Sequence, residues 1–203
     1  MMNPCKEALV IKMEPEVYLI KLKDSLDDKT FDFFLSLTEE KRKRKIQCQK
    51  IREKSQLKLL SENLAKYAIK KSFGIDIKKQ RIAYTELGKP YLLDYPDICF
   101  NISHSGRCVV CAVFSGNVGV DIQRIAEYKQ KLAAKVCSAI ELKHIEESTD
   151  KAVEFAKIWT KKEAYLKFLG TGIQNFNLKN VTDDIKDKIS TIIHDGYAIT
   201  VVY

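Results

Sequence analysis

Two oxygen-bearing side chains, Asp121 and Gln123, alternate with apolar residues in the segment from Val118 to Gln123. In a β-strand, residues two positions apart point to the same face, so the pattern predicts a strand with both side chains on one side. Carboxylate and amide oxygens are ligands of hard cations such as Mg²⁺, which also binds substrate phosphate oxygens. Taken alone, such a polar pair is more often exposed to solvent than bound to a metal.

A second group lies in the helical pattern that covers about Ala152 to Leu169, where Trp159, Glu163 and Lys167 follow one another at four-residue intervals. This spacing places them along one helix face. Glu163 could therefore bind a metal ion, and Lys167 could reach a phosphate as a point charge. The same spacing fits an ordinary surface pair of Glu and Lys beside a buried tryptophan, so the pattern leaves both interpretations open.

Other reactive residues give weaker signals. His104 lies where a strand is expected to turn, and loop positions of this kind often carry ligand contacts. Cys108 and Cys111 form a CxxC motif inside a strand-like run, but residues three apart in a strand point to opposite faces and cannot easily share one zinc ion. The sequence contains no nucleophile triad, Walker loop or dinucleotide fingerprint.

The net charge is +8, and the positive charge is concentrated in one block. From Lys41 to Arg81 there are 15 Lys and Arg residues against three acidic ones, and the run from Lys41 to Lys45 is unbroken. Such a block attracts phosphates or acidic partner surfaces. A solvated helix face is the ordinary alternative. Nucleic acid is a further candidate, although neither interleaved aromatic residues nor a known reader motif accompanies the block.

The elements that would position these residues are strands mixed with helices, which predicts an α+β protein. We expect two similar α+β halves, residues 1–110 and 111–203, packed tightly as one unit. Asp195-Gly196 suits the type I′ turn of a hairpin near the end of the chain. The main strands are expected at about 17–23, 82–87, 99–103, 107–114, 117–122, 188–194 and 197–203, and the longer helices at about 53–71, 127–136, 139–147 and 152–169.

The chain lacks the sequence features of export and of membrane insertion. Charged residues interrupt its first turns, where a secretory signal would carry an apolar core, and no apolar run is long enough to span a bilayer. Six cysteines without regular spacing are typical of reduced thiols rather than of a disulfide framework. We therefore expect a cytoplasmic protein that does not enter a membrane.

Four motifs, taken together and in order, closely resemble those of the Sfp-type 4′-phosphopantetheinyl transferase family. The resemblance spans about Thr38 to Gly170, and four ordered motifs are far more specific than any one of them. It implies the fold of that family, a pseudo-dimer of two similar α+β halves, each with a small antiparallel sheet and a long helix. The motifs are Gly88-Lys89-Pro90, Phe100-Asn101-Ile102-Ser103-His104-Ser105, Gly119-Val120-Asp121-Ile122 and Trp159-Thr160-Lys161-Lys162-Glu163-Ala164-Tyr165-Leu166-Lys167.

The resemblance implies an enzyme that transfers 4′-phosphopantetheine from coenzyme A to a serine of an apo acyl or peptidyl carrier protein and releases 3′,5′-ADP. It implies Mg²⁺, with Mn²⁺ as a substitute, bound by Asp121, Glu163 and Gln123. Glu163, Lys167 and Asp121 would be the catalytic residues, with Glu163 as general base. The partner would be an acidic carrier protein of fatty acid, polyketide or nonribosomal peptide biosynthesis, not a nucleic acid, and the fused halves suggest a monomer.

The same resemblance assigns residues to the coenzyme A molecule, which would lie between the halves. The residues that would hold the 3′-phosphate are Lys41, Arg44, Ser103 and His104. The residues that would border the adenine are Lys89 and Pro90. The residues that would contact the diphosphate and the phosphopantetheine are Lys162 and Lys167.

Two positions depart from the family pattern. Gln123 stands where relatives usually have Glu. An amide can bind Mg²⁺ through its oxygen or through a water, but it cannot act as a base, and the site then has one negative charge fewer than with Glu. This motivates a second hypothesis, a non-catalytic relative that binds coenzyme A or a carrier protein. Relatives also tend to carry Arg and Gly within Ser55 to Ser61, so Lys58 is an open candidate for a phosphate contact.

Overall fold

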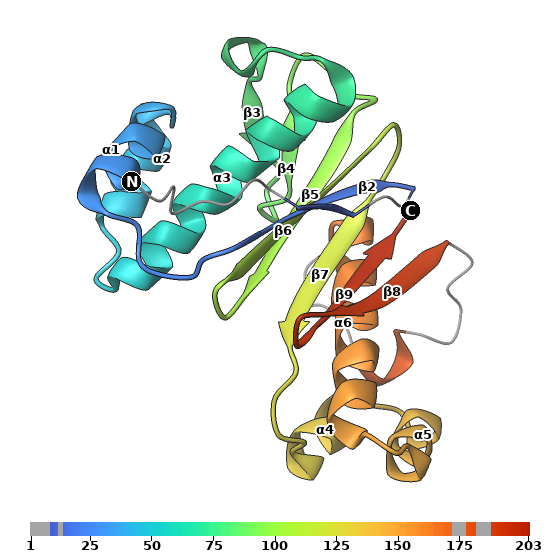
Figure 1. Ribbon diagram of the computed structural model, residues 1–203. Helices are drawn as coiled ribbons and strands as arrows, with labels where there is room; N and C mark the ends of the chain where they lie inside the picture. The colour runs from blue at the N-terminus through green and yellow to red at the C-terminus, as the bar shows by residue number, and fades with distance from the viewer. Residues whose placement is uncertain (1–8, 12–13, 172–177, 182–187) are drawn as a thin grey trace.

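The computed structural model describes residues 9–11, 14–171, 178–181 and 188–203, and each of its two main antiparallel sheets is covered by one long helix (Figure 1). The sheet of the first half has the strand order β1-β2-β6-β5, with every neighbouring pair antiparallel. A separate two-stranded hairpin, β3-β4, lies beside it. The strands are β1 (Leu9–Ile11), β2 (Glu16–Lys21), β3 (Ile82–Tyr84), β4 (Pro90–Leu92), β5 (Cys99–Ser105) and β6 (Cys108–Phe114).

The long helix of the first half is α3 (Arg52–Phe73), preceded by α1 (Asp28–Ser36) and α2 (Glu40–Gln47). Leu57, Leu60 and Leu64 recur at helical spacing on α3 and are buried against the first sheet. Gly74 ends the helix in the left-handed conformation, with a φ of 71°, which a residue without a Cβ adopts at little cost. A 3₁₀ turn at Ile77–Lys79 then leads into the hairpin.

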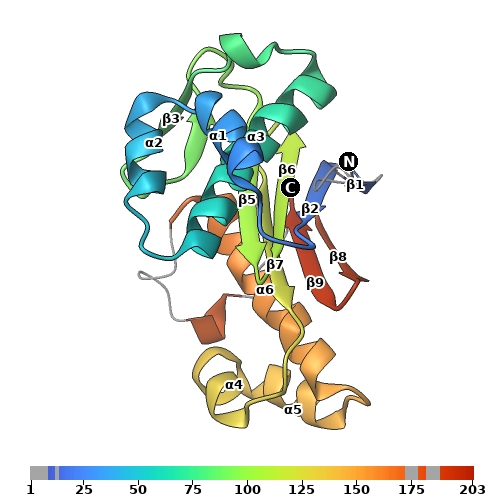
Figure 2. The ribbon, with the colours of Figure 1, turned by 60° about the vertical axis from the view of Figure 1, so that its left-hand side comes forward.

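The second half repeats this plan with a three-stranded sheet of order β7-β9-β8 and the long helix α6. Two shorter helices, α4 and α5, lie at the N-terminal end of α6, far from α1 and α2 in both views (Figures 1 and 2). The prediction of an α+β fold with two similar halves is therefore confirmed. The elements are β7 (Gly119–Arg124), α4 (Gln130–Val136), α5 (Ala139–Glu147), α6 (Lys151–Leu169), β8 (Ile189–His194) and β9 (Tyr197–Val202).

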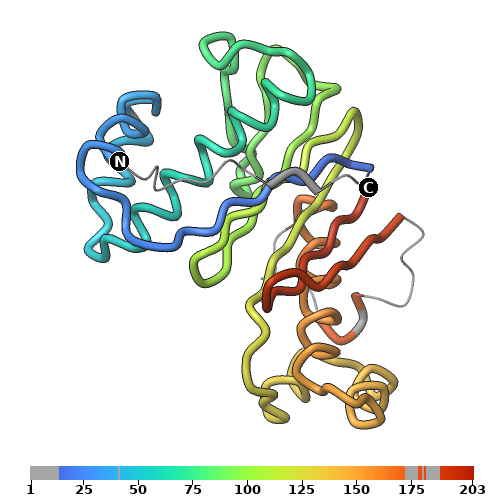
Figure 3. Tube along the Cα trace, viewed as in Figure 1, coloured from blue at the N-terminus to red at the C-terminus, as the bar shows by residue number. Residues whose placement is uncertain are grey.

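The division between the halves falls later in the chain than the expected residue 110. Strand β6 pairs with both β2 and β5, so a boundary after residue 110 would cut a strand in the middle of the first sheet. The chain passes from the first sheet to the second between Phe114 and Gly119 (Figure 3). The hairpin β8-β9 turns at Asp195 and Gly196, whose φ angles of 49° and 78° fit the predicted type I′ turn.

The two sheets pack face to face, with α3 and α6 on the outside. Alternate residues of β2 and β6 enter different cores: Val110 packs between the sheets with Val120 and Ile199, whereas Val109 packs toward α3. Cys108 and Cys111 are likewise divided between these two cores, so the prediction that they point to opposite faces of the strand is confirmed. In the part of the chain that the structure describes, no helix is both long and apolar enough to cross a membrane.

Candidate active site

Strand β7 and helix α6 approach unusually closely, and this contact brings the two predicted acidic residues together. Gly119 begins β7, and a Cβ atom at this position would lie 2.1 Å from the carbonyl oxygen of Ala164 and 2.4 Å from the amide nitrogen of Phe168. Only glycine allows the strand backbone to touch the helix backbone in this way. Asp121, two residues along the strand, therefore faces the helix turn that carries Glu163.

Asp121 is 5% exposed and is held by two donors. Its Oδ1 atom accepts a hydrogen bond of 2.7 Å from Ser103 on β5 and one of 2.6 Å from the Lys167 ammonium on α6. Lys167 also donates to the Ser103 hydroxyl at 2.8 Å and to the Val120 carbonyl at 3.2 Å. One strand from each half and the helix α6 thus converge on a single carboxylate.

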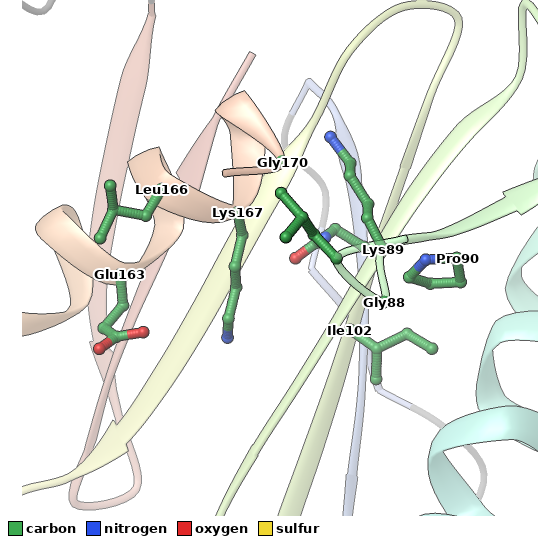
Figure 4. Close-up of a pocket in the computed structure, with 10 residues that line it drawn as sticks. Gly88, Lys89, Pro90, Ile102, Glu163, Leu166, Lys167 and Gly170 are labelled. Atoms are coloured by element: carbon green, nitrogen blue, oxygen red, sulfur yellow. The ribbon is translucent and has the colours of Figure 1, made fainter. Parts of the chain in front are cut away.

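Glu163 is 6% exposed and has no such donor among the residues that the structure describes, although the charges of Asp121 and Lys167 act on it. Burial and, after it, the negative charge of Asp121 raise the pKa of Glu163 to about 7, against the opposing effect of the Lys167 ammonium. Figure 4 shows the Glu163 and Lys167 side chains extending from α6 to the same side. Among the described residues, Lys167 is the ammonium that acts on both carboxylates, and such a pair is an environment that a cation stabilises.

One cavity extends from this group toward the first half, and a second cavity lies next to it. The first has a volume of about 260 Å³ and includes Glu163, Lys167 and Leu166 of α6 among its walls (Figure 4). The second has a volume of about 240 Å³ and opens next to α2 and α3. The residues that line both cavities, and so form their common wall, are Gly88, Pro90 and Ile102.

The second cavity is lined by basic residues and by the carboxylate of Glu62. Arg42 of α2, Lys58 of α3 and His104 of β5 all line it. The guanidinium of Arg42 lies 5.2 Å from the centre of the Tyr84 ring, and its Nε donates a 3.1 Å hydrogen bond to the buried Glu62. Partial burial lowers the pKa of His104, and the positive charges of Lys167 and Lys58 lower it further. The positive charges of Arg42 and Lys58 would favour an anion in the cavity, and the imidazole of His104 would offer it a hydrogen-bond donor rather than a charge.

Not every residue that the sequence suggested lies at these cavities. The Arg44 side chain is 77% exposed, and its Nε lies 4.0 Å from the Glu40 carboxylate. The side chain of Lys41 lies outside what the structure describes. Lys162 is 1% exposed and faces α5, where its ammonium pairs with Glu141 at 2.7 Å and donates to the Leu178 carbonyl at 2.6 Å. Its ammonium is therefore engaged away from the cavity-lining residues.

Three other predicted residues occupy distinct positions. Gln123 is half-buried on β7, two residues beyond Asp121, and its amide donates to the Arg124 carbonyl at 3.2 Å. Pro90 lines both cavities. Lys89 lines the first cavity, but its ammonium donates to Asn117 and to the Phe168 carbonyl.

Arg42 is the residue that sequence reasoning missed. The unbroken basic run gives no reason to prefer one of its members, since each carries a positive charge. One signal could have singled it out: Ile46 is the only apolar residue of α2 and lies four positions after Arg42, so the two share a helix face. Ile46 is fully buried, and Arg42 consequently points inward.

Comparisons with known proteins identify the family. Residues 26–115 match the family model described as 4′-phosphopantetheinyl transferase, N-terminal, and residues 117–202 match that of the 4′-phosphopantetheinyl transferase superfamily. The two matches meet where the chain passes from the first sheet to the second. The chain belongs to the 4′-phosphopantetheinyl transferase superfamily.

Similar curated proteins carry the same description. The chain is 34% identical over 146 residues to a 4′-phosphopantetheinyl transferase of Bacillus subtilis, covering 68% of this chain and 63% of that protein. It is 29% identical to 4′-phosphopantetheinyl transferase Sfp of Bacillus subtilis (strain 168), covering 78% and 71%. It is 31% identical to 4′-phosphopantetheinyl transferase gsp of Aneurinibacillus migulanus, covering 78% and 67%. A solved structure, Thermotoga maritima holo-[acyl-carrier-protein] synthase (AcpS), matches 42% of this chain and 61% of that chain with a TM-score of 0.37 and 20% identity.

Proposed function

We propose that this chain transfers 4′-phosphopantetheine from coenzyme A to a serine of an apo carrier protein and releases 3′,5′-ADP. The observation that carries the proposal is the proximity of Asp121 and Glu163, contributed by a strand and a helix far apart in sequence, where Glu163 lines a cavity that shares three residues with a second cavity containing Arg42 and Lys58. Membership of the family supports the same activity. A diphosphate ester needs cationic groups along its length, and this arrangement offers them.

The donor set of the acidic pair fits Mg²⁺. Asp121 and Glu163 supply carboxylate oxygens, and Gln123 supplies an amide oxygen from the same strand as Asp121. The ion, when bound, would neutralise the diphosphate and stabilise the charge of the departing 3′,5′-ADP. Mn²⁺ accepts the same oxygen ligands and would substitute.

The protein's own residues would perform the remaining tasks. Arg42, Lys58 and His104 would hold the 3′-phosphate of coenzyme A in the second cavity, with Lys41 and Arg44 contributing to the positive field. Lys167 would approach the diphosphate from the other side. Glu163, directly or through a water molecule, would accept the proton of the carrier serine. The serine oxygen would bond to the β-phosphorus as the bond from that phosphorus to the leaving oxygen breaks.

The partner in this proposal is an acidic carrier protein, since the net charge of +8 favours encounter with an acidic surface. The carrier would belong to fatty acid, polyketide or nonribosomal peptide biosynthesis. We further propose that the protein acts as a monomer, because residues of both halves already line the first cavity. We also propose that it acts in the cytoplasm. Free thiols at Cys48, Cys99, Cys108, Cys111 and Cys137 are consistent with that compartment.

The proposal is tested by incubating the purified protein with coenzyme A, Mg²⁺ and several apo carrier proteins, and by measuring each carrier by mass spectrometry. We expect the mass of the phosphopantetheine group to be added to at least one carrier, and only when Mg²⁺ or Mn²⁺ is present. Binding of coenzyme A without any mass gain on the carriers would instead support the non-catalytic alternative that Gln123 suggested.

We expect Arg42→Ala to weaken the binding of coenzyme A by roughly tenfold, because it removes a charged contact to the 3′-phosphate. The variant should bind 3′-dephospho-coenzyme A, which lacks that phosphate, as tightly as the wild type does. Calorimetric titration with both ligands measures the difference. Arg44→Ala is the matched control, since it removes the same charge from an exposed position. Equal losses in the two variants would contradict the specific placement of Arg42.

We expect Gln123→Glu to retain activity and to lower the Mg²⁺ concentration that gives half-maximal rate, because it adds a negative charge to the donor set. The rate of carrier modification as a function of Mg²⁺ concentration measures the effect. A variant that is inactive, or whose rate responds to Mg²⁺ as the wild type does, would remove Gln123 from the metal site.

A further inference from the structure

Lys89 holds three segments of the chain together. Its ammonium donates a hydrogen bond of 2.7 Å to Asn117 Oδ1 and one of 2.9 Å to the carbonyl oxygen of Phe168. Asn117 Nδ2 donates to the same carbonyl at 2.6 Å. The hairpin turn between β3 and β4, the crossing between the two halves and the C-terminal end of α6 therefore meet at one lysine.

The acceptor at the helix end is suited to this role. The last carbonyl groups of an α-helix have no partner within the helix, and a cation near the C-terminus is favoured by the helix dipole. The N–H group of Gly170 donates to the carbonyl oxygens of Leu166 and Lys167. The carbonyl oxygen of Phe168 instead accepts hydrogen bonds from Lys89 and Asn117. A Cβ at Gly170 would lie 3.3 Å from Cδ of Lys89, so the lysine stem packs closely against the helix end.

The turn of the hairpin benefits from such an anchor. In the described part of the chain, strands β3 and β4 pair only with each other, over three residue pairs. Leu92 of β4 is buried in the first core, but so short a two-stranded ladder adds little stability at the turn. Its turn is closed internally by bonds between Thr85 and Lys89, 2.9 Å and 3.0 Å long. The turn carries Gly88 and is followed by Pro90, two of the three residues that form the common wall of the cavities.

The Lys89 ammonium is directed away from the acidic group. Figure 4 shows its side chain extending from the turn away from the Glu163 carboxylate and the Lys167 ammonium. Two of its three N–H groups are occupied by protein acceptors. Burial lowers the pKa of Lys89, in keeping with an ammonium placed among neutral acceptors rather than beside a carboxylate.

We propose that Lys89 is a positioning residue, which ties the β3-β4 turn to the end of α6 and so holds the common wall of the cavities against the helix that carries Glu163 and Lys167. The proposal rests on the proposed function, since the ligand whose binding it controls is coenzyme A. In this role the lysine stem and Pro90 border the ligand, while the ammonium contacts no phosphate.

A double-mutant cycle separates this role from direct phosphate binding. Coenzyme A is titrated calorimetrically into the wild type, Lys89→Met, Asn117→Ala and the double variant, with Lys79→Met as a control for the loss of an exposed positive charge. We expect each single substitution to weaken binding by about tenfold, and the double variant to be no weaker than the weaker single variant, because both remove one tether. Additive losses, or a loss in Lys89→Met alone, would overturn the proposal.

Salt dependence gives a second readout. Removing a lysine that contacts a phosphate reduces the dependence of affinity on salt concentration, because fewer charges are screened. We expect Lys89→Met to retain the wild-type salt dependence and Arg42→Ala to lose part of it. A reduced dependence in Lys89→Met would assign its ammonium to the ligand and would contradict the tether.

A third measurement does not involve coenzyme A. Amide hydrogen exchange at Thr85 and Gly88, whose N–H groups close the turn, should be faster by about tenfold or more in Lys89→Met and in Asn117→Ala than in the wild type. Unchanged exchange in both variants would overturn the proposal. A wild-type protein that binds no coenzyme A would refute the proposed function. The exchange rates would then still test whether Lys89 ties the turn to the end of α6.

Discussion

Replacing Glu163 by glutamine is expected to reduce carrier modification by roughly 10³-fold, the scale of loss seen when one strongly stabilising group is removed from an active site. Glutamine has nearly the same shape, so the fold should persist, but the side chain loses both its negative charge for the cation and its ability to accept a proton. Single-turnover rates at saturating coenzyme A measure the loss. Glu154→Gln, on the same helix but distant from the cavities, is the matched control.

The same substitution should have the opposite effect on the stability of the metal-free protein. The pKa of Glu163 in the folded state, about 7, lies above its ordinary value of 4.5, so the fold binds this proton more tightly than the unfolded chain does. Ionisation therefore destabilises the fold, fully above pH 7 and not at all below pH 4.5. Glu163→Gln should melt at a higher temperature than the wild type at pH 8 in a chelator, and the difference should shrink as the pH falls.

Mg²⁺ should reverse this order of melting temperatures. At pH 8, added Mg²⁺ should raise the melting temperature of the wild type more than that of Glu163→Gln, because a ligand that binds only the folded state stabilises it in proportion to its affinity. Full transfer activity in Glu163→Gln, or a metal-free variant less stable than the wild type at pH 8, would contradict the role assigned to this carboxylate.

Substituting Gly119 by alanine is expected to destabilise the protein by about 3 kcal/mol or more, at the upper end of the cost of overpacking a buried contact. The added methyl group would lie 2.1 Å from the Ala164 carbonyl and 2.4 Å from the Phe168 amide, both of which are backbone atoms that cannot rotate away. Either β7 or α6 must then shift, which separates Asp121 from Glu163. Urea unfolding gives the change in stability.

Gly116→Ala is the control for this substitution. Its Cβ would meet only side-chain ring carbons of Phe114, at 3.3 Å, so a small adjustment of the ring suffices. We expect the Gly119 variant to lose transfer activity even at temperatures where it remains folded, since the acidic pair depends on the helix position. A Gly119→Ala protein with wild-type stability and activity would show that the close approach of β7 and α6 is dispensable.

Local periodicity was sufficient to predict much of the fold. Alternation of apolar and polar residues marked β7 and the face on which Asp121 lies, and the helical spacing of Leu57, Leu60 and Leu64 marked α3. The sequence could not place the division between the halves to the residue, because local pattern does not reveal strand partners: β6 is predicted as a strand in either half, and its pairing with β2 and β5 assigns it to the first sheet.

The candidate site was predictable to the extent that motif and spacing define it. Asp121, Glu163 and Lys167 come together, and Ser103 joins them through hydrogen bonds. The placement of Lys162 needed tertiary structure. Lys162 neighbours Glu163 in sequence, but the packing of α5 against α6 turns its ammonium to Glu141.

The choice among basic residues shows the same limit. Helix α2 carries positive charge on almost every side, so its charge pattern does not choose a face, and Ile46 gives the one hydropathy signal that does. Its orientation is set by contacts with α3, where Glu62 accepts a hydrogen bond from Arg42 and Ile46 is buried. Charge patterning could therefore identify the anion-binding block but could not distinguish Arg42 from Arg44.

The groups for the two ends of the ligand come from opposite halves of the chain: Arg42 and Lys58 from the first, Glu163 and Lys167 from the second. A ligand that contacts all four of these residues would link the two halves of the chain. We therefore expect neither half, expressed as a separate fragment, to retain coenzyme A, and we expect evolutionary loss of one half to eliminate the chemistry outright rather than to weaken it.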